Sequence, residues 1–181
     1  MAPKAPPLSS GEKLSFESEH AALASPAVGK LYVVRHADAG SRSAWAGPDA
    51  QRPLSKRGRH QAEGLRDQLA DAGVARLLAS PFTRCLQTLE PLGERLGIPV
   101  EADERLSENR GAAGALELAE EVRSAPAVLC SHGDVIPDVL DELLRQGIKL
   151  HDELRWQKAS TWALSWDGDR LAKGRYLPPP H

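Results

Sequence analysis

Two histidines follow short apolar runs, in positions that suit phosphoryl or proton transfer. Arg35 and His36 come directly after the run 31–34, and His132 comes after the run 127–131. An arginine side chain offers a planar fork of donors that matches phosphate oxygens. A histidine ring nitrogen can attack phosphorus or move a proton. A single histidine at such a place is more often a hydrogen-bonded structural residue, so the two positions together carry the argument.

A further basic residue, Arg84, comes shortly after a third apolar run. It lies four residues after Ser80, where the run 75–80 ends. His132 is followed by Gly133 at a predicted strand-to-helix junction, where free backbone N–H groups favour an anion. If there were no binding site here, His36, His132 and Arg84 would each need a separate structural reason for lying at or near a strand end. The pattern therefore predicts a pocket for an anionic group.

Alternating strands and helices are predicted to position these residues. Apolar runs alternate with amphipathic helical patterns along most of the chain. The expected strands are 31–34, 75–80, 99–102 and 127–131, and the expected helices are about 56–72, 83–96 (or from 81), 112–123 and 133–146. We therefore expect a three-layer α/β/α fold with a mostly parallel central sheet. In such a fold the functional site lies at the carboxyl ends of the strands.

Several single residues mark where elements begin and end. Ser55 is an expected N-cap, and Gly97 is expected to end the second helix. Pro91 is expected to kink or divide that helix, because proline lacks the backbone N–H. The segments 160–166 and 170–176 alternate in polarity around a turn, which predicts a hairpin.

Composition limits the class of protein. The chain has 181 residues, of which 41% are apolar, which suits one folded domain. We expect a flexible tail over 1–29, where proline and serine are frequent, and a domain over 30–181. With 23 basic and 25 acidic residues, the net charge of −2 argues against a nucleic-acid polymer as the main partner.

The sequence also argues against a membrane, a metal and a cofactor. No apolar run approaches the roughly 20 residues that span a bilayer. Cys85 and Cys130 lie in apolar stretches, so we expect two buried, reduced thiols and a cytoplasmic protein. The histidines show no metal-ligand spacing, and no cofactor or metal is expected.

Five motifs in order resemble the histidine phosphatase superfamily, which is also called phosphoglycerate-mutase-like. They occupy 33–38, 52–62, 80–88, 106–108 and 131–133. The resemblance extends over about residues 31–144. It implies the phosphoglycerate-mutase-like fold.

The resemblance also implies a mechanism. His36 would attack the phosphorus in line and form a phosphohistidine, while Arg35, Arg84 and His132 hold the phosphoryl oxygens. Glu108 would protonate the leaving oxygen and then activate water. Glu104, about one turn earlier, is the alternative proton donor.

This sequence departs from the family at one position beside the nucleophile. Ala37 stands where the family usually has glycine. Alanine fits there if its φ is negative, so we interpret it as a subfamily feature.

The residues within these motifs are most similar to those of two branches of the family. These are the short bacterial phosphohistidine phosphatases and the histidine phosphatase domain fused to some Nudix hydrolases. The implied substrate is a small phosphorylated molecule, such as a nucleotide or sugar phosphate, or a phosphohistidine protein. Arg42 could then bind a second phosphate, and Arg52 could face the pocket. Trp45 could stack on a base or simply cover the domain edge.

Two other functions remain open. A phosphoglycerate-type mutase would need an insertion after the second helix, for which this chain has no room. A non-catalytic module that binds phosphorylated ligands would have no need of a nucleophile beside an acid, so the complete set of candidate residues argues against it.

Overall fold

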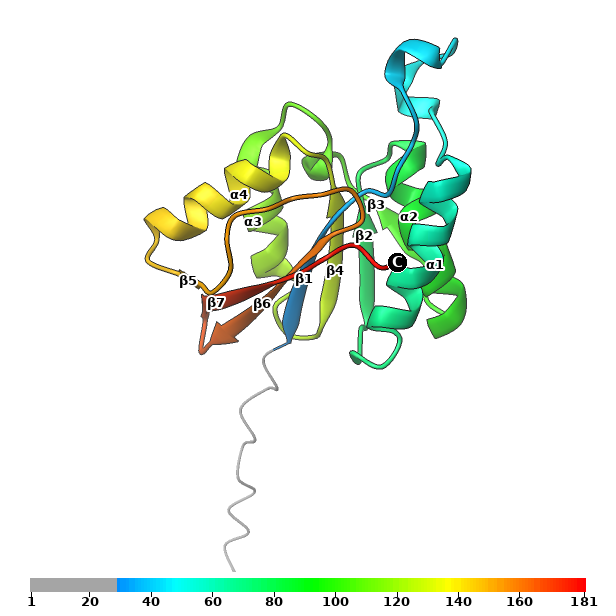
Figure 1. Ribbon diagram of the computed structural model, residues 1–181. Helices are drawn as coiled ribbons and strands as arrows, with labels where there is room; N and C mark the ends of the chain where they lie inside the picture. The colour runs from blue at the N-terminus through cyan, green and yellow to red at the C-terminus, as the bar shows by residue number, and fades with distance from the viewer. Residues whose placement is uncertain (1–28) are drawn as a thin grey trace, which may run out of the picture.

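The computed structural model describes residues 29–181. The tail predicted at 1–29 lies outside the described residues apart from Gly29, so it stays a prediction. The described part forms one sheet with helices on both faces (Figure 1).

The sheet has seven strands in the order β3-β2-β4-β1-β6-β7-β5. Their bounds are β1 Lys30–Arg35, β2 Arg76–Ala79, β3 Val100–Ala102, β4 Ala127–Ser131, β5 Lys149–Leu150, β6 Thr161–Asp167 and β7 Arg170–Leu177. Neighbours among β3, β2, β4 and β1 are parallel, and β5 is parallel to β7. Only β6 runs antiparallel to its neighbours, β1 and β7. The expected mostly parallel sheet is confirmed, and so is the C-terminal hairpin.

Four α-helices complete the three layers. They are α1 Lys56–Leu69, α2 Thr83–Leu96, α3 Gly111–Glu121 and α4 Val135–Arg145. Three short 3-10 helices, η1 Arg42–Ala44, η2 Asp49–Gln51 and η3 Glu104–Leu106, lie in the connections. The pair α1 and α2 lies on one side of the sheet and the pair α3 and α4 on the other (Figure 1). No helix within residues 29–181 is long and apolar enough to cross a membrane.

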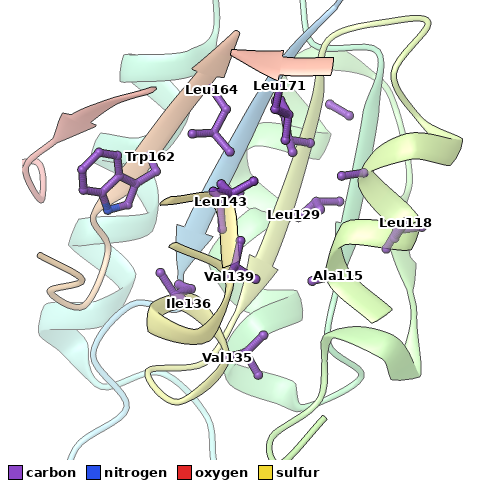
Figure 2. Close-up of a cluster of buried hydrophobic side chains, with 14 of the residues drawn as sticks. Ala115, Leu118, Leu129, Val135, Ile136, Val139, Leu143, Trp162, Leu164 and Leu171 are labelled. Atoms are coloured by element: carbon purple, nitrogen blue, oxygen red, sulfur yellow. The ribbon is translucent and has the colours of Figure 1, made fainter. Parts of the chain in front are cut away.

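Strand β1 shows why two separate cores form. Successive side chains of a strand point to opposite faces. Leu31 and Val33 belong to the core beside α3 and α4, while Tyr32 and Val34 belong to the core beside α1 and α2. Figure 2 shows the first core, where Trp162 of β6 lies among leucines and valines of β4 and α4. Because helices cover both faces of the sheet, the ends of the strands are the part of the sheet that they leave uncovered.

The helix boundaries follow the local signals, with one exception. The Ser55 side chain accepts a hydrogen bond from the Gly58 N–H (3.1 Å), and Gly97 ends α2 with a φ of 68°. Of the two expectations for Pro91, division of the second helix is wrong, because α2 runs continuously through it, and a kink stays a prediction. Leu89 and Leu92, on either side, are both fully buried in one core, which holds the two halves in line.

Candidate active site

The site residues lie where three parallel strands end side by side. Strands β2, β4 and β1 are neighbours, and they lead directly into Ser80, His132 and His36. The register pairs Arg35 of β1 with Ser131 of β4, so both histidines leave the sheet at the same level. Arg84 lies in the first turn of α2, which follows β2. The fold thus brings together residues that are about a hundred positions apart in the sequence.

The His36 imidazole is buried and is held in one tautomer. Its side chain is only 6% exposed, and Nδ1 donates a hydrogen bond to the Ala37 carbonyl (2.8 Å). The proton is therefore on Nδ1, and Nε2 carries a lone pair. Burial lowers the pKa of His36 to about 3, although the Ala37 carbonyl raises it, and the neighbouring cations lower it further. The ring is neutral at physiological pH and has a free nucleophilic nitrogen.

Three hydrogen bonds of the backbone hold residues 35–37 in place. The His36 N–H donates to the Ser131 carbonyl of β4 (3.0 Å), and the Ala37 N–H donates to Thr88 Oγ1 of α2 (2.9 Å). From the segment before β6, the Ala159 N–H donates to the Arg35 carbonyl (3.0 Å). Ala37 is fully buried and does not have a positive φ, so the conformation expected for alanine at this position is confirmed.

Two arginines carry buried donors that have no partner in the protein. Arg84 is fully buried and Arg35 partly so, and Nε of each makes no hydrogen bond. Another nitrogen of each is anchored: Arg84 Nη1 donates to the Asp49 carbonyl (2.9 Å) and Arg35 Nη1 to the Trp156 carbonyl (2.8 Å). Buried polar groups are normally paired, so unpaired cationic donors suit an oxyanion as ligand.

His132 stands against His36 and faces the acidic side of the site. The two rings meet edge to face with centroids 5.4 Å apart. His132 Nε2 hydrogen-bonds Ser80 Oγ (2.8 Å), and Nδ1 lies 3.4 Å from Glu108 Oε1. Cys85 packs beside the same ring and is fully buried, as expected of a structural thiol.

Of the two candidate acids, Glu108 is the one that lies among the cations. Its carboxylate accepts hydrogen bonds from Arg84 Nη2 (2.7 Å) and Arg42 Nη2 (3.0 Å). Glu104 accepts one from Ser107 Oγ (3.0 Å) instead. Glu108 therefore contacts His132 as well as Arg42 and Arg84.

The connection between β1 and α1 holds the other predicted residues. Arg42 is largely exposed, with 62% of its side chain accessible, and pairs with Asp49 and Glu108. Arg52 is buried and donates to the Ala39 carbonyl (2.7 Å) and to Asp49 (2.9 Å), so it ties the loop together. Trp45 is exposed on the same loop. Substrate contacts by Arg42, Arg52 and Trp45 stay predictions.

Three polar residues of the site were missed by the sequence reasoning. They are Asp49, which contacts three arginines, Ser80, which contacts His132, and Thr88, which accepts a hydrogen bond from the Ala37 N–H. Ser80 and Thr88 lie inside a recognised motif, and their spacing from Arg84 was an available signal. Asp49 lies three residues before Arg52 and had no signal of its own. Among the described residues, no cluster of three or more His, Cys, Asp or Glu could hold a metal ion.

The fold and the site together define an α/β protein in which a buried histidine lies among cationic side chains. The sequence matches the profile of the histidine phosphatase superfamily (branch 1) over residues 31–127. An 8-oxo-(d)GTP phosphatase of Mycolicibacterium smegmatis is 38% identical over 155 residues, covering 83% of this chain and 48% of that protein. The chain belongs to the histidine phosphatase superfamily.

Phosphohistidine phosphatases are also among the similar proteins. Phosphohistidine phosphatase SixA of Escherichia coli is 36% identical over 78 residues, covering 41% of this chain and 45% of that protein. A solved structure of the putative SixA from Agrobacterium tumefaciens has a TM-score of 0.66 at 24% identity, covering 83% of this chain and 98% of that one. The phosphoglycerate-mutase-like fold is thereby confirmed. The chain spans about half the length of the curated relatives that it matches.

Proposed function

We propose that this chain is a phosphatase that acts through a phosphohistidine intermediate on His36. The observation that carries the proposal is the tautomer of the buried His36 ring. With Nδ1 committed to the Ala37 carbonyl, Nε2 is the nitrogen available for attack. Arg35, Arg84 and His132 are near enough for their charges to act on this ring, and in the proposal they hold the phosphoryl oxygens. A phosphoryl group carries about two negative charges, which this surround of cations neutralises without requiring a metal.

In the first step His36 Nε2 attacks phosphorus while the bond to the leaving oxygen breaks. The electron pair of that bond goes to the leaving oxygen, which takes a proton from Glu108 and departs as the alcohol or its equivalent. Glu108 reaches this role from the edge of the pocket, where its side chain is 23% exposed. The buried arginines supply charge stabilisation that needs little reorganisation.

In the second step water hydrolyses the phosphohistidine. Glu108, now a carboxylate, takes one proton of the water as its oxygen attacks phosphorus. The P–N bond breaks, its electron pair returns to His36 Nε2, and inorganic phosphate leaves. The proton stays on Nδ1 throughout, hydrogen-bonded to the Ala37 carbonyl, so the ring returns to its starting tautomer.

A nucleotide is the substrate class that we favour. The relative that aligns with 83% of this chain is named an 8-oxo-(d)GTP phosphatase. Arg42 and Trp45, on the loop beside Glu108, offer an exposed cation and an exposed aromatic ring to such a substrate. A phosphohistidine protein is the second candidate, supported by the SixA relative, and a sugar phosphate the third. A cytoplasmic location, and the absence of nucleic-acid and membrane partners, stay predictions.

The test is phosphate release by the wild-type chain and His36→Ala in excess EDTA. The panel holds nucleoside di- and triphosphates, nucleoside monophosphates, sugar phosphates, phosphoglycerates and a phosphohistidine peptide. We expect turnover by the wild type alone, and an alkali-stable, acid-labile phosphoryl adduct on His36 after rapid quenching. Equal turnover by His36→Ala would show that the proposal is wrong. Isomerised phosphoglycerate would favour a mutase, and binding without turnover a non-catalytic module.

A further inference from the structure

Two arginines and two carboxylates close a ring at the mouth of the site. Arg84 Nη2 lies 2.7 Å from Glu108 Oε1 and 3.1 Å from Asp49 Oδ2. Arg42 Nη2 lies 3.0 Å from Glu108 Oε2 and 2.9 Å from the same Asp49 Oδ2. Each arginine therefore touches both carboxylates, and charges alternate around the ring. Asp49 and Glu108 come from η2 and from the segment after η3, so only the fold brings them together.

This ring bears directly on the proton that Glu108 has to carry. A carboxylate held by two arginines alone is strongly stabilised in its ionised form and makes a poor acid. Asp49 is paired with both arginines as well, and its negative charge offsets part of their effect on Glu108. Hydrogen bonds from Arg52 and Arg42 and the charge of Arg84 outweigh the burial of Asp49, and its pKa is about 2. Asp49 therefore remains an anion over the whole working range of pH.

We propose that Asp49 is a positioning residue that keeps Glu108 able to carry a proton, by sharing Arg42 and Arg84 with it. The inference rests on the proposed function, in which Glu108 is the acid. When a phosphoryl group takes up donors of Arg84, Asp49 still holds that guanidinium through its carboxylate and through its backbone carbonyl (2.9 Å). Glu108 can then leave the arginines and turn toward the leaving oxygen.

The charged groups around Glu108 come from every neighbouring element. Arg42 belongs to η1 and Arg84 to α2, and His132 follows β4, with Nδ1 3.4 Å from the carboxylate. Asp134 accepts a hydrogen bond from the backbone N–H of the next residue, Asn109 (2.7 Å). Of these groups, only Arg42 and Arg84 also contact Asp49, so a change at Asp49 reaches Glu108 through them.

The test compares Asp49→Asn with Arg42→Gln, because the ring predicts opposite effects. Without the Asp49 charge, both arginines act on Glu108 alone, and the alkaline limb of the kcat–pH profile moves to lower pH. Without Arg42, Glu108 loses one cation, and the limb moves to higher pH. Arg42 is largely exposed, so this second variant is expected to fold. Inorganic phosphate should inhibit Asp49→Asn more strongly than the wild type, since one anion that competes for the arginines is gone.

Leaving groups give a second readout. p-Nitrophenyl phosphate leaves without a proton, whereas glycerol phosphate requires one. General acids typically contribute about 100-fold or more, so we expect Asp49→Asn to lower kcat about 10-fold on glycerol phosphate and by less than about 3-fold on p-nitrophenyl phosphate. Glu108→Gln should show the same preference more strongly. Glu101→Gln is the control, because it removes a carboxylate bound to Arg76 at 2.8 Å, in a pair that joins β3 to β2.

Each result has one meaning for the inference. Opposite shifts of the alkaline limb with a selective loss on glycerol phosphate support it. Equal losses on both substrates with weaker phosphate inhibition would mean that Asp49 only maintains structure, which overturns it, as would kinetics like those of Glu101→Gln. An active His36→Ala would overturn the proposed function itself, which no result at Asp49 can mimic.

Discussion

At the scale of single residues, Gly133 leaves the space through which Arg35 reaches the site. A Cβ built on Gly133 would lie 2.7 Å from Cζ and Nη2 of Arg35, and its φ is not positive, so alanine fits the backbone. We expect Gly133→Ala to displace the end of a flexible side chain, to cost little stability, and to lower kcat/KM about 10-fold or more by weakening phosphoryl binding.

A double-mutant cycle checks that Arg35 carries this effect. Gly133→Ala is measured in the wild type and in Arg35→Ala, together with the melting temperature of each variant. If the glycine acts through Arg35, adding Gly133→Ala to Arg35→Ala changes kcat/KM little further. Additive losses in the two backgrounds would contradict this account.

Single residues were predictable where a local motif holds them. Arg35 is the last residue of β1, and His36 and His132 directly follow β1 and β4. Their place at the strand ends follows from the alternating pattern. Asp49 had no such pattern, because its role depends on arginines at 42, 52 and 84 that meet only in the fold. Which of Glu104 and Glu108 faces the cations was likewise decided by packing, not by spacing.

At the scale of elements, the start of α1 packs against the loop that follows His36. A Cβ on Gly58 would lie 1.9 Å from the Asp38 carbonyl oxygen, which also accepts the Ser55 N–H (2.9 Å). Backbone cannot yield as a side chain does, so Gly58→Ala must move α1 or the loop after His36. We expect a loss of about 2 kcal/mol or more in unfolding free energy, with reduced activity.

Gly64→Ala, in the same helix, is the matched control for this prediction. A Cβ on Gly64 would lie 2.5 Å from Cβ of Pro180, so the segment that holds Pro180 has to shift, whereas the loop after His36 does not. Alanine also favours helix by about 1 kcal/mol over glycine, which offsets part of this cost. In urea unfolding, Gly58→Ala should therefore lose more unfolding free energy than Gly64→Ala. A Gly58→Ala protein as stable as Gly64→Ala would show that α1 and the loop are not coupled in this way.

Elements were predictable where they are long enough to show a period. The helices α1 to α4 and the strands β1 to β4 lie within a few residues of expectation. Strand β5 has two residues and η1 to η3 have three each, too short for any periodic signal. Pro91 misled because proline disfavours a helix locally, whereas burial of Leu89 and Leu92 in one core favours continuing it.

At the scale of the whole molecule, the buried, neutral ring of His36 makes stability depend on pH. The His36 pKa is about 3 in the folded chain and about 6.5 when unfolded, so the unfolded state binds more protons between these values. Stability is therefore highest above pH 6.5 and falls as the pH drops toward 3. From pH 7 to pH 5 this one residue should cost about 2 kcal/mol.

Urea unfolding at pH 7 and pH 5 of the wild type and His36→Asn measures this contribution. The difference between the two pH values should be about 2 kcal/mol smaller in the variant, because asparagine does not titrate. Asp38 and Asp49, whose carboxyl pKa values are both about 2 in the folded chain, lose their stabilisation only below about pH 4. They therefore leave the interval from pH 7 to pH 5 unaffected. If the free energy of unfolding falls equally in both proteins between pH 7 and pH 5, burial does not keep the His36 ring neutral. The proposed attack by Nε2 would then need another source of an unprotonated ring.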